Sequence, residues 1–363
     1  MRAAVCAIVA AIGLAVPPAS AQPGRSVAAF WQAVQAACDA AAAKPPSERG
    51  KRIAQAAIDE FTRFGGHRID ADGRLFRFGL TEAEHAQEAG DDRPARLGDL
   101  GWWRVLAYWR ALYGEAAAAK LEVLGYRGAS AATDAAQDTA LLRSDAARLL
   151  RAAESVSDPA DREILREAAL RMAAIDTPWS AAFVSFVIRQ AGVGADAFAF
   201  ANAHRIFIYD AFATSAAEQH RAGDGRLYRA CPLATRPRAG DLICQQREPA
   251  LAGADDRTVR ERIRLELEGG TEAQTVRRTH CEVVAHVDAR ARKVYTIGGN
   301  VNQSVTARKL NLRRDLRLSA AQRGRCGGAG RWTLPRPAGA VGERAPAPCS
   351  LNERKWFVLL QVR

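Results

Sequence analysis

The sequence changes its pattern near residue 237, and this change limits the possible fold more than any other feature. Before it, apolar residues recur at the three- and four-residue spacing of amphipathic helices, over 26–43, 51–64, 101–114 and parts of 135–174. After it, four short runs rich in β-branched or alternating residues are bounded by turn residues, as is typical of strands, at 238–246, 280–288, 293–301 and 355–362. We therefore expect an α+β fold, with a helical N-terminal portion and a small antiparallel sheet. A short alternation at 67–78, with an Asp-Gly turn, favours an additional hairpin.

The first residues have the pattern of a secretory signal peptide. Arg2 precedes an apolar segment, and Ala19-Ser20-Ala21 forms a small-residue cleavage site. The apolar run is too short to cross about 30 Å of hydrocarbon, so we expect no transmembrane segment in the mature chain. The prediction is a periplasmic or secreted protein with a signal peptide at 1–21, a mainly helical region at 22–150 and a hydrolase-type core at 151–363. A charged excursion at about 248–279 contains a further helix and borders or covers the site.

Removal of Cys6 with the signal peptide would leave six of the seven cysteines. An even number in an oxidising compartment permits disulfides, although spacing does not define their connectivity. We expect Cys326 to pair with Cys349, because they bracket an irregular Gly/Pro/Arg segment. A weaker hypothesis pairs Cys244 with Cys281 on neighbouring strands. No cluster has the spacing of a zinc site, so we predict no metal and no cofactor.

The formal net charge is +12, carried mostly by arginine. Such a charge would attract anionic partners such as cell-wall polymers. A GC-rich genome, which inflates both Arg and Ala, is the simpler explanation and the one we favour. The chain has no helix-turn-helix, zinc-finger or aromatic-basic pattern, so we predict no nucleic-acid partner. The sequence makes no statement about oligomeric state.

The segment 177–193 carries the most chemical information. Thr177 is predicted to cap a helix and Pro178 to occupy its first position, which places Ser180 in the first turn. A nucleophile there benefits from the positive end of the helix dipole and from free N–H groups, which also stabilise an oxyanion. Alone the signal is weak, because most first-turn serines only satisfy backbone groups.

Four motifs in this order carry a resemblance to known families. The run TPWSAAFVS at 177–185, AGDLI at 239–243, HCEVV at 280–284 and IGGNVNQSV at 297–305 resemble the CHAP amidases and NlpC-type peptidases of cell walls. Those enzymes have a papain-like fold, with a helix-borne cysteine, a histidine on a strand and a polar orienting residue on the next. The set is most similar to domain-of-unknown-function family 2272, over roughly 53–363, with serine in the TPW motif.

The resemblance implies roles for three residues. Ser180 occupies the nucleophile position, His280 the position of the general base, and Asn300 the position of the residue that orients the base. It further implies amide hydrolysis by acyl transfer, with peptidoglycan stem peptides as substrate. We take Trp179, His204 and Tyr209 as candidate substrate-binding residues, although a structural role is the default for a histidine such as His204.

Serine at the cysteine position leaves two hypotheses open. A thiolate site works through a lowered cysteine pKa, whereas a serine needs a base to remove its proton during attack. The first hypothesis is an active Ser-His-Asn hydrolase. The second is an inactive envelope module that binds peptide or glycan in the same groove. A third possibility is an interaction protein that uses the helical region and its aromatic residues; for Trp102 and Trp109, however, the helical spacing favours a packed core.

Overall fold

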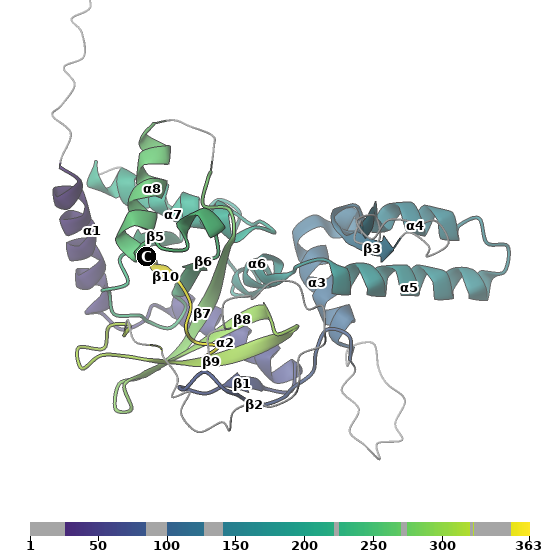
Figure 1. Ribbon diagram of the computed structural model, residues 1–363, viewed down its shortest axis with the longest axis horizontal. Coiled ribbons are helices and arrows are strands. Elements are labelled where there is room, and N and C mark those ends of the chain that lie inside the picture. Colours follow the sequence, from purple (N-terminus) through teal and green to yellow (C-terminus); the bar gives the residue numbers. More distant parts are fainter. Residues whose placement is uncertain are drawn as a thin grey trace, which may run out of the picture.

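The computed structural model describes residues 26–84, 100–126, 141–220, 225–269, 274–319, 322 and 350–363. In these ranges the central element is an eight-stranded sheet with the order β2-β1-β9-β8-β7-β6-β10-β5 (Figure 1). Its neighbours are antiparallel except β1 and β9, which are parallel. The α+β class is confirmed, and the sheet is larger than expected. Its strands are β1 (His67–Ile69), β2 (Leu75–Arg77), β5 (Tyr228–Cys231), β6 (Leu242–Gln246), β7 (Thr279–Asp288), β8 (Lys293–Val301), β9 (Ser304–Asn311) and β10 (Trp356–Val362).

The strands expected at 238–246, 280–288, 293–301 and 355–362 correspond to β6, β7, β8 and β10, and the hairpin at 67–78 to β1 and β2. β5 and β9 were not expected from the sequence. β9 follows β8 through a tight turn in which Asn302 and Gln303 both have positive φ, of 52° and 61°. This conformation matches the right-handed twist of a two-residue hairpin, although neither residue is glycine.

Helices cover both faces of the sheet, as the strand residues require. Leu242 and Cys244 belong to one hydrophobic core, whereas Ile243 between them belongs to the other, because successive strand side chains point to opposite faces. The larger core includes residues of α6 (Ser180–Gln190) and α7 (His204–Gln219). The remaining helices near the sheet are α1 (Val27–Ala42), α2 (Glu48–Arg63), η4 (Pro249–Leu251) and α8 (Asp256–Glu268).

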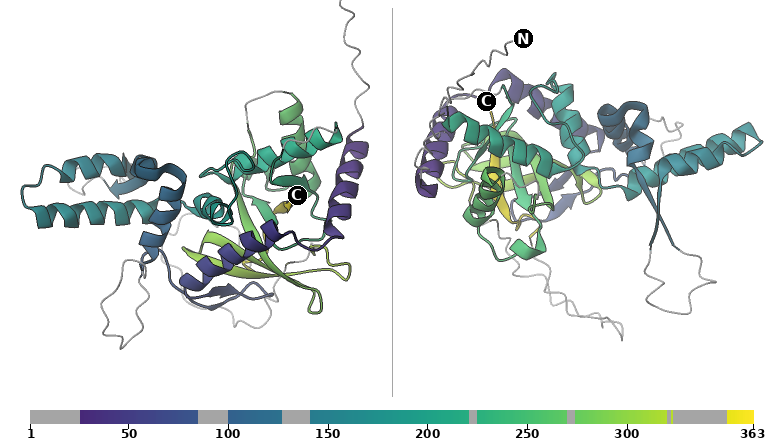
Figure 2. Two further views of the ribbon diagram at one scale, coloured as in Figure 1. Left: turned by 180° about the vertical axis from the view of Figure 1, so that it is seen from behind. Right: turned by 90° about the horizontal axis from the view of Figure 1, so that it is seen from above.

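A second group of elements projects sideways from the sheet. It comprises α3 (Gly101–Tyr113), η2 (Gly114–Lys120), the hairpin of β3 (Glu122–Tyr126) and β4 (Leu141–Asp145), α4 (Ala146–Ala153) and α5 (Pro159–Asp176). Both views of Figure 2 show α4 and α5 extending away from the sheet. The expected aromatic stripe of α3 is confirmed as core, since Trp102 and Trp109 are 2% and 1% exposed.

Two disulfides join distant parts of the chain. Cys244 and Cys281 face each other on β6 and β7, with Cα atoms 4.0 Å apart, which confirms the weaker of the two pairing hypotheses. Cys38 on α1 pairs with Cys231 at the end of β5, across 193 residues of sequence. The expected Cys326–Cys349 pair and the signal peptide at 1–21 lie outside the described residues.

The region expected as 22–150 and the core expected as 151–363 share one sheet. β1 pairs with β9, and the Cys38–Cys231 disulfide joins the two regions covalently. No helix in the described ranges is both long and apolar enough to cross a membrane.

Candidate active site

Ser180 is the first residue of α6. The expected helix start was displaced by two residues: Thr177 ends α5 instead of capping α6, and Trp179 occupies the N-cap position without a side-chain cap. The Thr177 hydroxyl is used elsewhere, since it accepts a hydrogen bond of 2.8 Å from the backbone N–H of Glu122 in the projecting hairpin. Ser180 therefore lies in the first turn as expected, next to N–H groups that no capping side chain satisfies.

Close packing fixes the start of α6. The Trp179 indole is fully buried, and its Nε1 donates a hydrogen bond of 2.5 Å to Glu82. Gly299 on β8 approaches so closely that a Cβ atom there would lie 2.5 Å from Phe183 and 2.8 Å from Trp179. Glycine at this position therefore permits the close approach of β8 to α6, and the residue that follows it, Asn300, has a positive φ of 53°.

The hydroxyl of Ser180 has a histidine partner, but not the expected one. His204 Nε2 lies 2.8 Å from Ser180 Oγ. His204 begins α7, and this places its ring over the first turn of α6. We expected a hydrogen bond between Ser180 and His280; it is absent, because neither ring nitrogen of His280 has a hydrogen-bond partner among the described residues.

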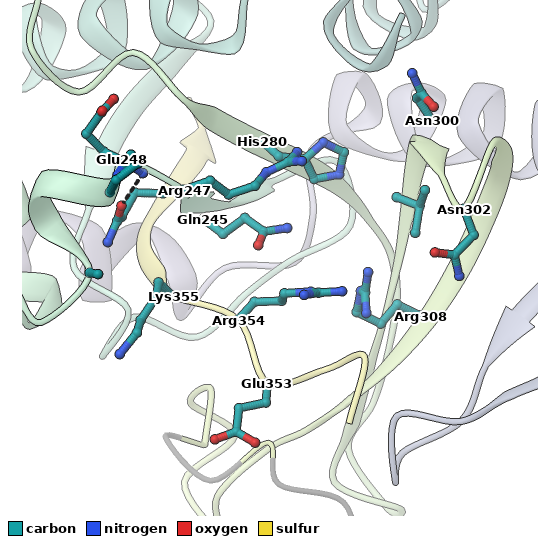
Figure 3. Close-up of a pocket in the computed structure, with 14 residues that line it drawn as sticks. Gln245, Arg247, Glu248, His280, Asn300, Asn302, Arg308, Glu353, Arg354 and Lys355 are labelled. Atoms are coloured by element: carbon teal, nitrogen blue, oxygen red, sulfur yellow. Dashed lines mark hydrogen bonds between the residues drawn. The ribbon is translucent and has the colours of Figure 1, made fainter. Parts of the chain in front are cut away.

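His280 lies immediately behind His204. The two rings pack edge to face with centroids 5.0 Å apart. Gly298 leaves room for His280, since a Cβ atom there would lie 3.1 Å from its Nε2. Asn300 forms no hydrogen bond with the His280 ring, and Figure 3 shows its side chain pointing away from that ring. In this arrangement His280 supports His204 through packing, while Asn300 lines the groove.

A buried ion pair that the sequence analysis missed lies next to His280. Glu282 accepts hydrogen bonds from Arg308 Nε, at 3.0 and 3.1 Å to its two oxygens, and from Thr296 Oγ1 at 2.5 Å. His280 Nε2 lies 3.6 Å from Glu282 Oε1, within ion-pair range but beyond hydrogen-bond distance. The period of two along a strand puts Glu282 on the same face as His280, so the spacing in HCEVV was the available signal.

The electrostatic environment keeps both histidines neutral at pH 7. Burial lowers the pKa of His204 well below its usual value, with smaller contributions from His280 and Arg247. Burial also lowers the pKa of His280, against the opposing effect of Glu282. The pKa of Glu282 itself is lowered to about 2: burial raises it, but the attraction of Arg308 and hydrogen bonds to its carboxylate outweigh that effect. A neutral His204 is able to accept a proton from Ser180.

Two neighbouring cavities lie around these residues and share part of their lining; together they are called the groove. The first, about 630 Å³, contains Ser180 and His204 and is lined further by Pro178, Asn202, Ala203, Arg247, Arg277, Arg278, Thr279 and Asn300. The second, about 390 Å³, contains His280 and shares Arg247 and Asn300 with the first (Figure 3). Glu248 and Pro249 line the second cavity and Arg277–Thr279 line the first, so the excursion at about 248–279 borders the groove as expected. Among the described residues no group of three His, Cys, Asp or Glu side chains is arranged to hold a metal ion.

A family model for uncharacterized proteins conserved in bacteria matches residues 98–362. The chain belongs to this family, DUF2272. The match includes Ser180, His204, His280 and Glu282, so the whole site lies within the family domain. Neither a curated protein nor a solved structure matches the chain. The resemblance to CHAP and NlpC-type enzymes stays a prediction.

The other two candidate substrate-binding residues lie away from the groove lining. Trp179 has no exposed surface and packs against Phe64 and Tyr108. Tyr209 is 4% exposed, and its hydroxyl donates a hydrogen bond of 2.5 Å to Glu266 on α8. Of the three candidates, only His204 lines the cavity that contains Ser180.

Asp241 of the AGDLI motif has a structural role. Its carboxylate accepts hydrogen bonds of 2.8 Å from the backbone N–H groups of Arg238 and Val362. It therefore fixes the turn before β6 and the end of β10. Cys244, three residues further along on β6, is bonded to Cys281, so neither cysteine is available as a nucleophile.

Proposed function

We propose that this protein is a hydrolase that acts by acyl transfer on an amide bond, with Ser180 as nucleophile and His204 as general base. The observation that carries the proposal is the 2.8 Å contact between Ser180 Oγ and His204 Nε2, both of which line the first cavity of the groove. A hydroxyl becomes an effective nucleophile when a neutral base lies within hydrogen-bond distance. His204 replaces His280 in the role that the resemblance implied.

The steps follow from the positions of these groups. His204 Nε2 takes the hydroxyl proton while Ser180 Oγ forms a bond to the carbonyl carbon. The N–H groups at the start of α6 stabilise the oxyanion of the tetrahedral intermediate. His204 then returns the proton to the leaving amine, and the C–N bond breaks. In the second half of the cycle His204 takes a proton from the water that attacks the acyl ester. The ester C–O bond then breaks, and His204 returns this proton to Ser180 Oγ, which restores the free enzyme.

The substrate that we propose is the peptide part of peptidoglycan, outside the cytoplasm. The support is the resemblance of the four motifs, the signal-peptide pattern and the charge of the groove. Arg247, Arg277 and Arg278 line the Ser180 cavity, whose lining includes no acidic side chain. Stem peptides carry carboxylates, so a cationic groove suits them. The Cys38–Cys231 and Cys244–Cys281 disulfides favour an oxidising compartment.

A second candidate function is binding without catalysis in the same groove. The observation in its favour is that His204 Nδ1, although buried, has no acceptor among the described residues. In Ser-His-Asp sites a third group fixes the tautomer of the base. Without such a group, Ser180 and His204 would only line a binding groove with polar atoms and would not catalyse a reaction.

Hydrolysis of purified peptidoglycan, measured as newly exposed amino groups, separates the two candidates. We expect activity in the wild type, a loss of at least about a thousandfold in Ser180→Ala and of about a hundredfold or more in His204→Gln. Ser155→Ala, which changes an exposed serine at the end of α4, is the matched control and should retain full activity. Binding to peptidoglycan without hydrolysis by the wild type would instead support the second candidate. Hydrolysis by the Ser180→Cys variant but not by the wild type would identify an enzyme site that is inactive because serine replaces the cysteine nucleophile.

A further inference from the structure

The second cavity of the groove contains a buried polar side chain, His280, that has no hydrogen-bond partner among the described residues. We define the arginine pocket by Gln245, Arg247, His280, Arg308 and Arg354, all of which line this cavity. Gln245 is 4% exposed and His280 is 1% exposed. Neither ring nitrogen of His280 has a hydrogen-bond partner among the described residues, and in Figure 3 the Gln245 amide lies between Arg247 and Arg354. Buried polar groups without partners are costly, so their presence in a cavity indicates a ligand site.

The charges in the pocket are not balanced. Arg308 is paired with Glu282, and its Nη1 donates to the backbone oxygen of Leu351. Neither Arg354 nor Arg247 has an ion-pair or side-chain hydrogen-bond partner within the described ranges. Burial and the nearby Arg308 lower the pKa of the Arg354 guanidinium, which reflects crowding of positive charge. The guanidinium groups of Arg247, Arg308 and Arg354 therefore have a single carboxylate, that of Glu282, to balance their charge.

The acidic side chains in the lining do not neutralise this excess of positive charge. Glu248 and Glu353 both line the cavity, but Figure 3 shows their carboxylates pointing away from the space between Arg247, Arg308 and Arg354. The neutral His280 and the Gln245 amide add uncharged hydrogen-bonding groups. The space therefore has the donors for one oxyanion, with the planar donor pattern that guanidinium groups offer to a carboxylate.

We propose that the arginine pocket binds a carboxylate of the substrate, so that the enzyme acts on acidic peptides whose carboxylate lies close to the scissile amide. The inference rests on the proposed function and extends it from reaction to substrate class. The pocket adjoins the reactive residues: Arg247 and Asn300 line both cavities, and the His280 ring packs against the ring of His204. A peptide whose carbonyl lies at Ser180 would extend along this groove with its carboxylate among the guanidinium groups.

Binding to the Ser180→Ala variant tests the pocket without turnover. The probes are a peptidoglycan stem tetrapeptide, the same peptide with every carboxyl converted to an amide, and inorganic phosphate, each titrated by calorimetry. A hydrogen bond to a charged group changes affinity by about ten- to a hundredfold. We expect the free tetrapeptide to bind at least about tenfold more tightly than the amidated one. Arg354→Gln in the Ser180→Ala background should remove the difference, and Arg290→Gln, an exposed arginine outside the pocket lining, should retain it.

Three results would overturn the proposal: equal affinity for the two peptides, a difference that survives Arg354→Gln, or tighter binding of phosphate than of the free tetrapeptide. Turnover of both peptides by the wild type is measured separately. Hydrolysis that is indifferent to amidation contradicts the carboxylate pocket and leaves the proposed function standing. Selective binding of the free tetrapeptide with no hydrolysis contradicts the proposed function and leaves the pocket standing.

Discussion

Replacing Glu282 with glutamine tests whether the buried ion pair holds the site together. Glu282 is fully buried, accepts hydrogen bonds from Arg308 and Thr296, and lies 3.6 Å from His280 Nε2. Glutamine preserves the shape but removes the charge and directs an amide N–H₂ group toward donors. Arg308, which is 2% exposed, would remain charged and uncompensated. Removing one partner of a buried pair costs about 3–5 kcal/mol.

The pKa of Glu282 leads to a similar magnitude. Its pKa is lowered from 4.5 to about 2 in the folded protein. The difference of about 2.5 between the pKa values of the folded and unfolded chains corresponds to about 3 kcal/mol. Because the folded pKa is the lower one, this stabilisation is complete above the unfolded pKa, near 4.5. It is lost as the pH falls from there through about 2.

The assay is urea denaturation at pH 7 and again between pH 5 and 3, followed by circular dichroism. We expect Glu282→Gln to lower the free energy of unfolding by about 3–5 kcal/mol at pH 7 and to weaken its fall below pH 5. Asp315→Asn is the control, because Asp315 forms a more exposed pair with Arg313 at 3.1 Å and should change stability by less than about 1 kcal/mol. A loss in Glu282→Gln no larger than in Asp315→Asn would refute the reasoning.

Three further outcomes are expected. Cys38→Ser opens a covalent loop of 193 residues and should lower the free energy of unfolding by about 3–5 kcal/mol in urea denaturation; an unchanged midpoint would contradict the disulfide. Gly299→Ala should lower both stability, by about 1–3 kcal/mol, and hydrolysis, because the added Cβ meets the nucleophile helix, whereas Gly253→Ala, with nothing within 4 Å, should be neutral. The rate of hydrolysis should stay constant from pH 8 to below 6.5, since burial lowers the pKa of the base, His204; a half-maximal rate at or above pH 6.5 would count against that assignment.

Local patterns of the sequence predicted the elements of the fold well. The helical spacing at 26–43, the Asp-Gly turn of the hairpin at 67–78 and the strand pattern of β6 and β7 act over a few residues, and each is present as expected. The position of Ser180 in a first turn was predicted correctly even though the capping residue was not, because Thr177 hydrogen-bonds to a hairpin that is distant in sequence. Tertiary contacts of this kind produce no periodic pattern in the sequence from which they could be predicted.

The candidate site was predicted only in part for the same reason. The order of motifs placed Ser180 and His280 in one groove, but it did not reveal that His204, from the start of a separate helix, lies between them. The partner of Ser180 depends on where α7 packs, and that position is set by buried contacts instead of by spacing. The pairing of Glu282 with Arg308 joins β7 to β9 across the intervening β8, and the sequence analysis did not identify β9 at all.

The central claim, that Ser180 is a nucleophile activated by His204, is tested most directly by covalent labelling. A fluorophosphonate reacts with activated serines whatever their natural substrate, and peptide mapping by mass spectrometry locates the adduct. The account predicts a single adduct on Ser180 in the wild type, its loss in His204→Gln, and its persistence in Tyr209→Phe, a residue outside the cavity lining. A folded wild-type protein in which Ser180 stays unlabelled, or labelling that is equal in His204→Gln, would contradict the claim.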